Sequence, residues 1–100
     1  MKVHWLACIV SPGQFSNEYT VKGETFNGQE FALFAPDNFV DCGENEPSWE
    51  QPVLGWLQIK VIGKVKNILL VRLPMPPLEG PQTITVQDKK VSLREAPQKA

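Results

Sequence analysis

The residues that could support nucleophilic catalysis are one histidine, His4, and two cysteines, Cys8 and Cys42. A nucleophilic side chain must lie within hydrogen-bond reach of a base. The apolar, β-branched stretch 3–10 predicts a strand, on which His4 and Cys8 share a face but stand roughly 13 Å apart at ~3.3 Å per residue. No pattern brings Cys42 to His4. We therefore expect no catalytic dyad and predict that the protein is not an enzyme.

Both cysteines are expected to be unreactive, for different reasons. Cys8 falls inside the predicted strand and should be a small buried hydrophobic residue. Cys42 lies among carboxylates, which disfavour its thiolate. Two cysteines also make no disulfide framework.

Metal ligands are sparse in this chain. One histidine and two separated cysteines fit no zinc spacing. The carboxylates of residues 37–46 could in principle surround a calcium ion, but the alternation of ligands in an EF-hand loop is missing. No glycine-rich phosphate loop or marked carboxylate pair is present. We expect no metal and no cofactor.

Charge is distributed unevenly along the chain. The net charge is −1, which gives the whole molecule no electrostatic reason to bind nucleic acid or an anionic membrane. Residues 36–55, however, carry five acidic residues and no basic one, whereas residues 56–100 carry eight basic and three acidic residues. The two regions could pair with each other in the fold or form separate surfaces.

A long acidic loop is expected at residues 37–52, where the alternation of apolar and polar residues disappears. Loops of this length in compact domains are often functional. Trp49 could fold back into the core, or it could anchor a partner, since tryptophan is enriched at binding hot spots. With Glu46 and Glu50 it makes the first candidate binding surface.

The second candidate surface is the stretch 55–74, which predicts two strands joined by a Gly63-Lys64 turn of type II′. In that register Leu57 faces Leu70 and Ile59 faces Ile68. The lysines Lys60, Lys64 and Lys66 make this ribbon basic.

Two binding modes are compatible with the basic ribbon. The opposite charges of loop and ribbon could support head-to-tail self-association. Alternatively, the ribbon from Lys60 to Arg72 could bind single-stranded nucleic acid, as small β-barrels do with a basic groove and stacking aromatic residues. The acidic loop and the missing RNP-type aromatic motif argue against that alternative.

The remaining segments predict two more hairpins and a stiff connection. Asn27-Gly28 is a strong turn signal between strands at 19–26 and 29–35. Strands at 82–87 and 90–93 are expected to pair over Asp88-Lys89. Four prolines in residues 74–81 predict an extended surface connection, which also formally matches the P-x-x-P pattern of SH3 ligands.

About seven short strands and no long helix predict an all-β fold, a small antiparallel barrel or sandwich, with SH3-like and OB-like barrels both possible. We expect a single domain at 1–95, containing the acidic loop 37–52 and the Pro-rich connection 74–81, followed by a flexible tail at 96–100. A cytoplasmic location without membrane contact is predicted. The expected function is that of a non-catalytic interaction module or subunit of an assembly, bound to a protein partner or to itself. The candidate binding residues are Trp49, Glu46, Glu50, Lys60, Lys64 and Lys66.

Overall fold

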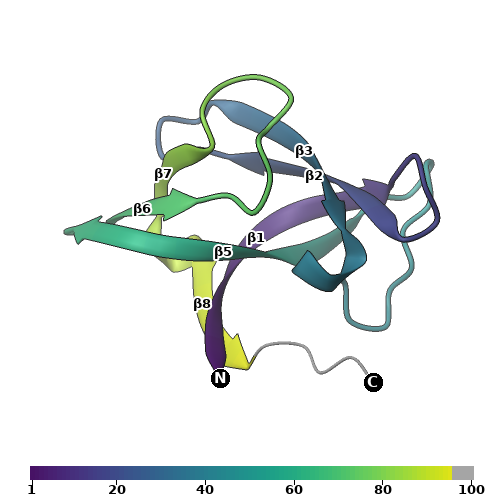
Figure 1. Cartoon of the computed structure of the whole chain (residues 1–100), viewed down its shortest axis with the longest axis horizontal. Helices are drawn as coiled ribbons and strands as arrows, with labels where there is room; N and C mark the ends of the chain where they lie inside the picture. The colour runs from purple at the N-terminus through teal and green to yellow at the C-terminus, as the bar shows by residue number, and fades with distance from the viewer. Residues whose placement is uncertain (96–100) are drawn as a thin grey trace.

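Eight antiparallel strands build the described part of the chain, residues 1–95 of this computed structural model (Figure 1). They are β1 (Lys2–Pro12), β2 (Glu18–Glu24), β3 (Glu30–Pro36), β4 (Val40–Asp41), β5 (Val53–Val65), β6 (Ile68–Arg72), β7 (Thr83–Gln87) and β8 (Val91–Glu95), with short 3-10 helices η1 (Asp37–Phe39) and η2 (Asp88–Lys90). Their order is β3-β2-β1-β5-β6-β7, with β4 added to β5 and β8 to β1. The predicted all-β, barrel-like fold is confirmed. The predicted tail, 96–100, lies outside the described residues.

β1 is the central strand of the sheet. Its side chains alternate, so that Leu6, Cys8 and Val10 are buried in the core while Ala7 and Ile9 are exposed on the outer face. One edge of β1 pairs with β5, and the other edge pairs first with β8 and then with β2. Ala7 and Cys8 lie between the part of β1 that pairs with β8 and the part that pairs with β2.

β5 is long because it belongs to two halves of the sheet. Its first half pairs with β1 on one edge and with β4 on the other, and only its second half pairs with β6. The expected pairing of Leu57 with Leu70 is therefore wrong, since Leu57 lies between Leu6 and Val40. The alternation predicted for β5 itself is confirmed, because Leu57 is fully buried.

The turn of the ribbon formed by β5 and β6 is displaced from its expected position. A turn at residues 63–64 is wrong: the two-residue loop is 66–67, and Val65 lies opposite Ile68. This register, with a bulge near residue 62, buries Leu69 and Val71 in the core. It requires Lys66 to adopt a φ of 55°, which costs about 1–2 kcal/mol for a residue with a side chain. Burial of two apolar side chains outweighs that cost.

The β2–β3 hairpin is confirmed, with a slightly longer loop than expected. The Thr25 N–H donates to the Gln29 carbonyl at 2.8 Å, which leaves three residues in the loop. Gly28 closes the loop with a φ of 82°, as a three-residue hairpin with a G1 bulge requires.

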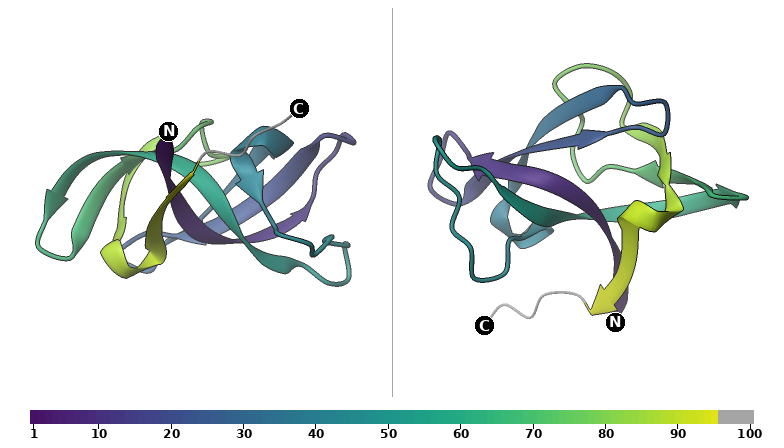
Figure 2. Two further views of the ribbon diagram at one scale, coloured as in Figure 1. Left: turned by 90° about the horizontal axis from the view of Figure 1, so that it is seen from below. Right: turned by 180° about the vertical axis from the view of Figure 1, so that it is seen from behind.

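The predicted hairpin of residues 82–93 is wrong. β7 pairs with β6, whereas η2 redirects the chain and β8 pairs with the first half of β1 (Figure 2). The Asp88 N–H donates to the Asn67 carbonyl at 3.0 Å, which fixes η2 to the ribbon turn. Pairing with β8 gives the first half of β1 a neighbour on both edges, which a local hairpin would not have done.

The Pro-rich connection between β6 and β7 helps to close the curled sheet. The Leu78 N–H donates to the Ala32 carbonyl of β3, and the Phe26 N–H of the β2–β3 loop donates to the Thr85 carbonyl of β7, both at 2.8 Å. Most of the connection is exposed at the surface, as expected. Within residues 1–95 no helix is long and apolar enough to cross a bilayer.

Candidate functional site

The two predicted binding surfaces lie at opposite ends of the molecule. Trp49, Glu46 and Glu50 belong to the loop that joins β4 to β5, and the basic residues belong to the β5–β6 ribbon, whose turn is at the left of Figure 1. β5 spans the distance between them along the longest dimension, 37 Å. The structure therefore places one set on the loop and the other along the ribbon, and it keeps the two sets apart.

The acidic loop presents Trp49 to solvent. Its side chain is 67% exposed, so the interpretation of Trp49 as a core plug is wrong. Ser48 and Gln51 hold the turn beneath it: each N–H donates to the other's carbonyl at 3.2 Å, and the Gln51 N–H also reaches the Ser48 hydroxyl at 3.0 Å. Trp49 and Glu50 are therefore displayed at the tip of a hydrogen-bonded turn.

A polar pocket of about 300 Å³ lies at the base of the same loop, lined in part by Tyr19, Cys42 and Glu46. Burial, then Cys42, Asp37 and Glu46, raise the pKa of the Tyr19 hydroxyl. Burial and the neighbouring Asp41 raise the pKa of the Cys42 thiol. This direction agrees with the expected suppression of the Cys42 thiolate, although burial is a larger cause than the neighbouring carboxylate.

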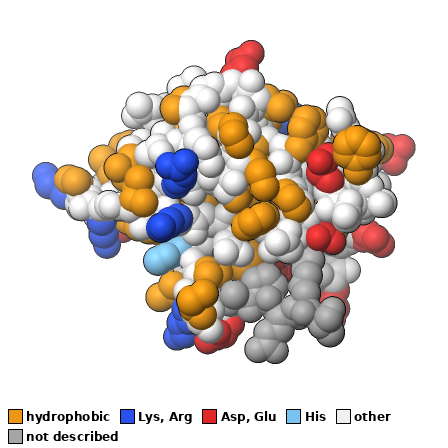
Figure 3. All heavy atoms as spheres, viewed as in Figure 1, with side chains coloured by type: hydrophobic (Ala, Val, Ile, Leu, Met, Phe, Trp, Pro, Cys, Tyr) orange, Lys and Arg blue, Asp and Glu red, His pale blue; other side chains and the backbone are white. Residues whose placement is uncertain are grey.

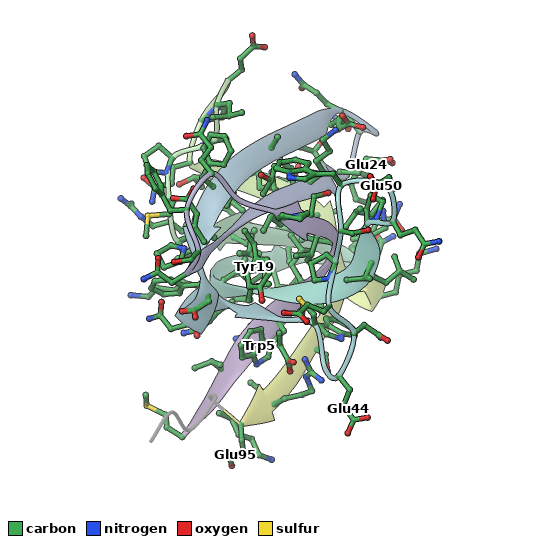
Figure 4. The ribbon with its side chains drawn as sticks, turned by 90° about the vertical axis from the view of Figure 1, so that its right-hand side faces the viewer. Trp5, Tyr19, Glu24, Glu44, Glu50 and Glu95 are labelled. Atoms are coloured by element: carbon green, nitrogen blue, oxygen red, sulfur yellow. The ribbon has the colours of Figure 1, made fainter. Side chains whose placement is uncertain are left out.

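Few of the opposite charges pair with each other within residues 1–95. Asp41 accepts from the Arg94 guanidinium at 3.5 Å, and Lys64 lies 3.9 Å from Asp88. Only the first of these contacts joins the acidic segment to the basic half. Among the described residues, the following exposed groups have no ion pair within 4.0 Å: Glu44, Glu46, Glu50, Lys60, Lys66 and Arg72. Glu44 projects away from the body of the loop (Figure 4).

The ribbon combines basic and apolar side chains. Lys60 lies opposite Arg72, and Lys66 occupies the turn. Val65, beside the turn, is 68% exposed, and Ile62 at the bulge is half exposed. On the face seen in Figure 3, Lys and Arg side chains gather toward the ribbon end and Asp and Glu toward the opposite end.

A groove on the outer face of the sheet was not predicted from the sequence. Its volume is about 390 Å³, and its apolar walls come from Ala7 and Ile9 of β1 and Leu54 and Trp56 of β5. Leu54 is 81% exposed, the most of any leucine in the described chain. The charged residues at its rim are Lys22, Glu24, Glu30 and Lys90. We name this feature the outer groove.

Glycines form part of the floor of the outer groove. A Cβ atom on Gly55 would lie 2.8 Å from Val10 Cγ2 and 3.0 Å from the Asp41 carbonyl oxygen. These contacts lie on the core face of β5, opposite the face that carries Leu54 and Trp56. The groove adjoins the acidic loop along the chain, because its wall residue Leu54 stands at the start of β5, four residues after Glu50. Cys8 also lines it, but burial raises the pKa of its thiol to about 12, with Lys90 opposing in part. The prediction that Cys8 is a buried residue is confirmed.

A cation–π stack stands beside the groove. The Arg94 guanidinium lies 4.7 Å from the centroid of the Trp56 ring and 5.6 Å from that of Trp5, which is buried. Trp56 is thus already stacked on a side chain of its own domain. This matters for the nucleic-acid alternative, because that binding mode uses aromatic faces that are free to stack on bases.

The sequence did contain a signal for the outer groove. The run Trp-Leu-Ala-Cys-Ile-Val at residues 5–10 is apolar on both faces of its strand, as is typical of a strand covered on both sides. In the described structure the core covers one face, and Ala7 and Ile9 remain exposed on the other.

Comparison with protein-family models, curated proteins and solved structures finds no match to this chain. The proposals for its function therefore rest on the geometry described above.

Proposed function

We propose that the protein is a non-catalytic interaction module, a subunit of an assembly, that binds its partner through the outer groove. The observation that carries this proposal is the exposure of Leu54 on the wall of an apolar groove. Complete burial of one such side chain by a partner contributes roughly 1.5–3 kcal/mol. Exposed apolar patches bordered by polar residues are typical of protein interaction sites.

The acidic loop supports the same proposal. Because hydrogen bonds hold the backbone of its turn, Trp49 requires little ordering of the backbone when a partner covers it. The unpaired carboxylates of Glu46 and Glu50 would attract a partner of positive charge and raise its rate of association.

The test compares two leucine variants as bait in lysate of the native host. Leu54→Lys places a charge on the groove wall, and Leu78→Lys makes the same change at an exposed site on the Pro-rich connection. We expect a stoichiometric protein to be retained by the wild type and by Leu78→Lys and to be lost with Leu54→Lys. Equal retention by both variants would contradict the proposal.

Binding of single-stranded nucleic acid at the ribbon is a second candidate. It is favoured by the placement of Lys60 directly opposite Arg72, with Lys66 exposed at the turn. A labelled single-stranded oligonucleotide should then bind with an affinity that falls steeply with salt. Lys60→Gln should weaken that binding, and Lys22→Gln, on β2, serves as the matched control. Salt-independent or absent binding would eliminate this candidate.

A further inference from the structure

We propose that the partner of the outer groove is a second copy of this chain, whose ribbon turn docks at the groove and the acidic loop. This inference rests on the proposed function and names the partner of the same site. Repetition of the contact would give a head-to-tail assembly.

The first argument is charge complementarity between groups that the fold leaves unpaired. Glu46 and Glu50 on the loop, and Lys60 and Lys66 on the ribbon, make no intramolecular ion pair among the described residues. Fields of opposite sign steer encounter and fix the relative orientation of two surfaces. A second copy supplies, by necessity, both the surface and its complement.

The second argument is apolar complementarity at the same two places. Val65 projects beside the ribbon turn at 68% exposure, and Leu54 projects on the groove wall at 81% exposure. The register places Val65 next to Lys66, so one narrow element carries an apolar side chain and a positive charge together. A groove with apolar walls next to an acidic loop matches that combination.

The third argument is geometric. The ribbon and the acidic loop lie at opposite ends of the molecule, so the contact has to form between copies (Figure 1). Two different surfaces make a heterologous contact, which generates a ring or an open chain rather than a closed symmetric pair. In Figure 2 the ribbon extends beyond the rest of the sheet, where the turn is accessible to another molecule.

The test uses two variants that each lose one surface. The groove variant carries Leu54→Ser and Glu50→Gln, and the ribbon variant carries Val65→Ser and Lys66→Asn. All four side chains are exposed, and asparagine accepts the positive φ of residue 66, so both variants should fold. Leu78→Ser with Glu79→Gln makes the same chemical change as the groove variant on the Pro-rich connection and serves as the control.

Sedimentation velocity at rising protein concentration gives the readout. At low salt the average mass of the wild type and the control should exceed twice the monomer mass, and it should fall toward the monomer at high salt. Each variant alone should remain monomeric. An equimolar mixture should form a dimer and stop there, because each pair contains one intact groove and one intact ribbon.

Three results would overturn the inference. These are a wild type that stays monomeric at low salt, variants that assemble as the wild type does, or variants that block assembly without complementing each other. If a host protein is still lost specifically with Leu54→Lys in any of these cases, the proposed function stands and only the second copy is wrong. If Leu54→Lys affects neither assembly nor capture, both proposals fail.

Discussion

The guanidinium of Arg94 lies 4.7 Å from the centroid of the Trp56 ring, and this contact links β8 to β5 across the outer face of β1. β8 has five residues and pairs with β1 alone among the described strands. The ion pair between the N-terminal amine and Glu95 at its end is exposed, so that pair adds little to stability. The stack, extended to Trp5 and Asp41, is therefore the main side-chain contact of β8 on the outer face.

Substitution of Arg94 tests this relationship. Arg94→Ala removes a cation from two indole rings and should lower the free energy of unfolding by about 1 kcal/mol, since the side chain is partly exposed. Arg94→Lys should retain part of the effect, because an ammonium keeps the charge but lacks the planar stacking surface. Equilibrium unfolding in urea measures both. Arg72→Ala, which removes an exposed arginine without an ion pair among the described residues, is the control, and an equal loss there would contradict the prediction.

Local signals in the sequence predicted the elements whose pairing is also local. The β2–β3 hairpin follows from Asn27-Gly28, because few residues other than glycine close such a loop at positive φ. The strand at 3–10 follows from its β-branched and aromatic content. Both predictions are confirmed because neither depends on contacts distant in sequence.

The ribbon register and the last hairpin could not be predicted in the same way. Gly63 is a better turn former than Lys66, and the chain turns at Lys66 because this places Leu69 and Val71 in a core completed by distant strands. β8 likewise pairs with β1, almost ninety positions earlier in the chain. The strand with which β8 pairs is decided by the edges that the folded sheet leaves open, and no residue pattern within 82–95 indicates which edge that is.

The candidate site was predicted only in part, because it too depends on contacts between residues that are distant in sequence. The exposure of Trp49 was one of two alternatives, and only the position of its turn outside the core decides between them. The outer groove depends on Leu54 and Ile9, which become neighbours through the β1–β5 register. Sequence reasoning identified loops and charges, but not a surface assembled from two paired strands.

Gly55→Ala should destabilise the fold more than Gly63→Ala. A Cβ on Gly55 would lie 2.8 Å from Cγ2 of the buried Val10 and 3.0 Å from the Asp41 carbonyl oxygen, so Gly55→Ala overpacks the core face of β5 and should cost about 1–3 kcal/mol. A Cβ on Gly63 would meet Leu70 at an ordinary 3.7 Å, so Gly63→Ala should be close to neutral. Thermal unfolding of the two variants measures the difference. A Gly55→Ala variant as stable as Gly63→Ala would show that the core is not tightly packed around Gly55.

Lys66 should be replaceable with a gain in stability. Its φ of 55° is tolerated better by asparagine, so Lys66→Asn should raise the free energy of unfolding by about 0.5–1 kcal/mol. Lys66→Val should lower it, because a β-branched side chain is strained at this backbone conformation. Urea unfolding of the pair separates the effect of conformation from that of charge, since both variants remove the same ammonium. Equal stabilities would contradict the assigned turn.

Alkaline pH should destabilise the fold through Cys8. Burial raises the pKa of its thiol to about 12 in the folded chain, against 9.0 for an exposed thiol. Below pH 9 the thiol is protonated in both states and the full stability is present. As pH rises from 9 toward 12, the unfolded chain loses this proton while the folded chain keeps it, so stability is progressively lost. The free energy of unfolding measured between pH 7 and pH 11 should therefore fall.

Replacement of Cys8 measures how much of the alkaline loss of unfolding free energy is due to its thiol. Cys8→Ala should lower stability at every pH, because it leaves a cavity in the core, but the loss between pH 9 and 11 should become smaller than in the wild type. The remaining slope should include Tyr19 and Cys42, whose pKa values burial also raises. Cys42→Ser, which removes the more exposed thiol, is the matched control and should change the slope less. A slope unaltered by Cys8→Ala would mean that the Cys8 thiol ionises equally in the folded and unfolded chains.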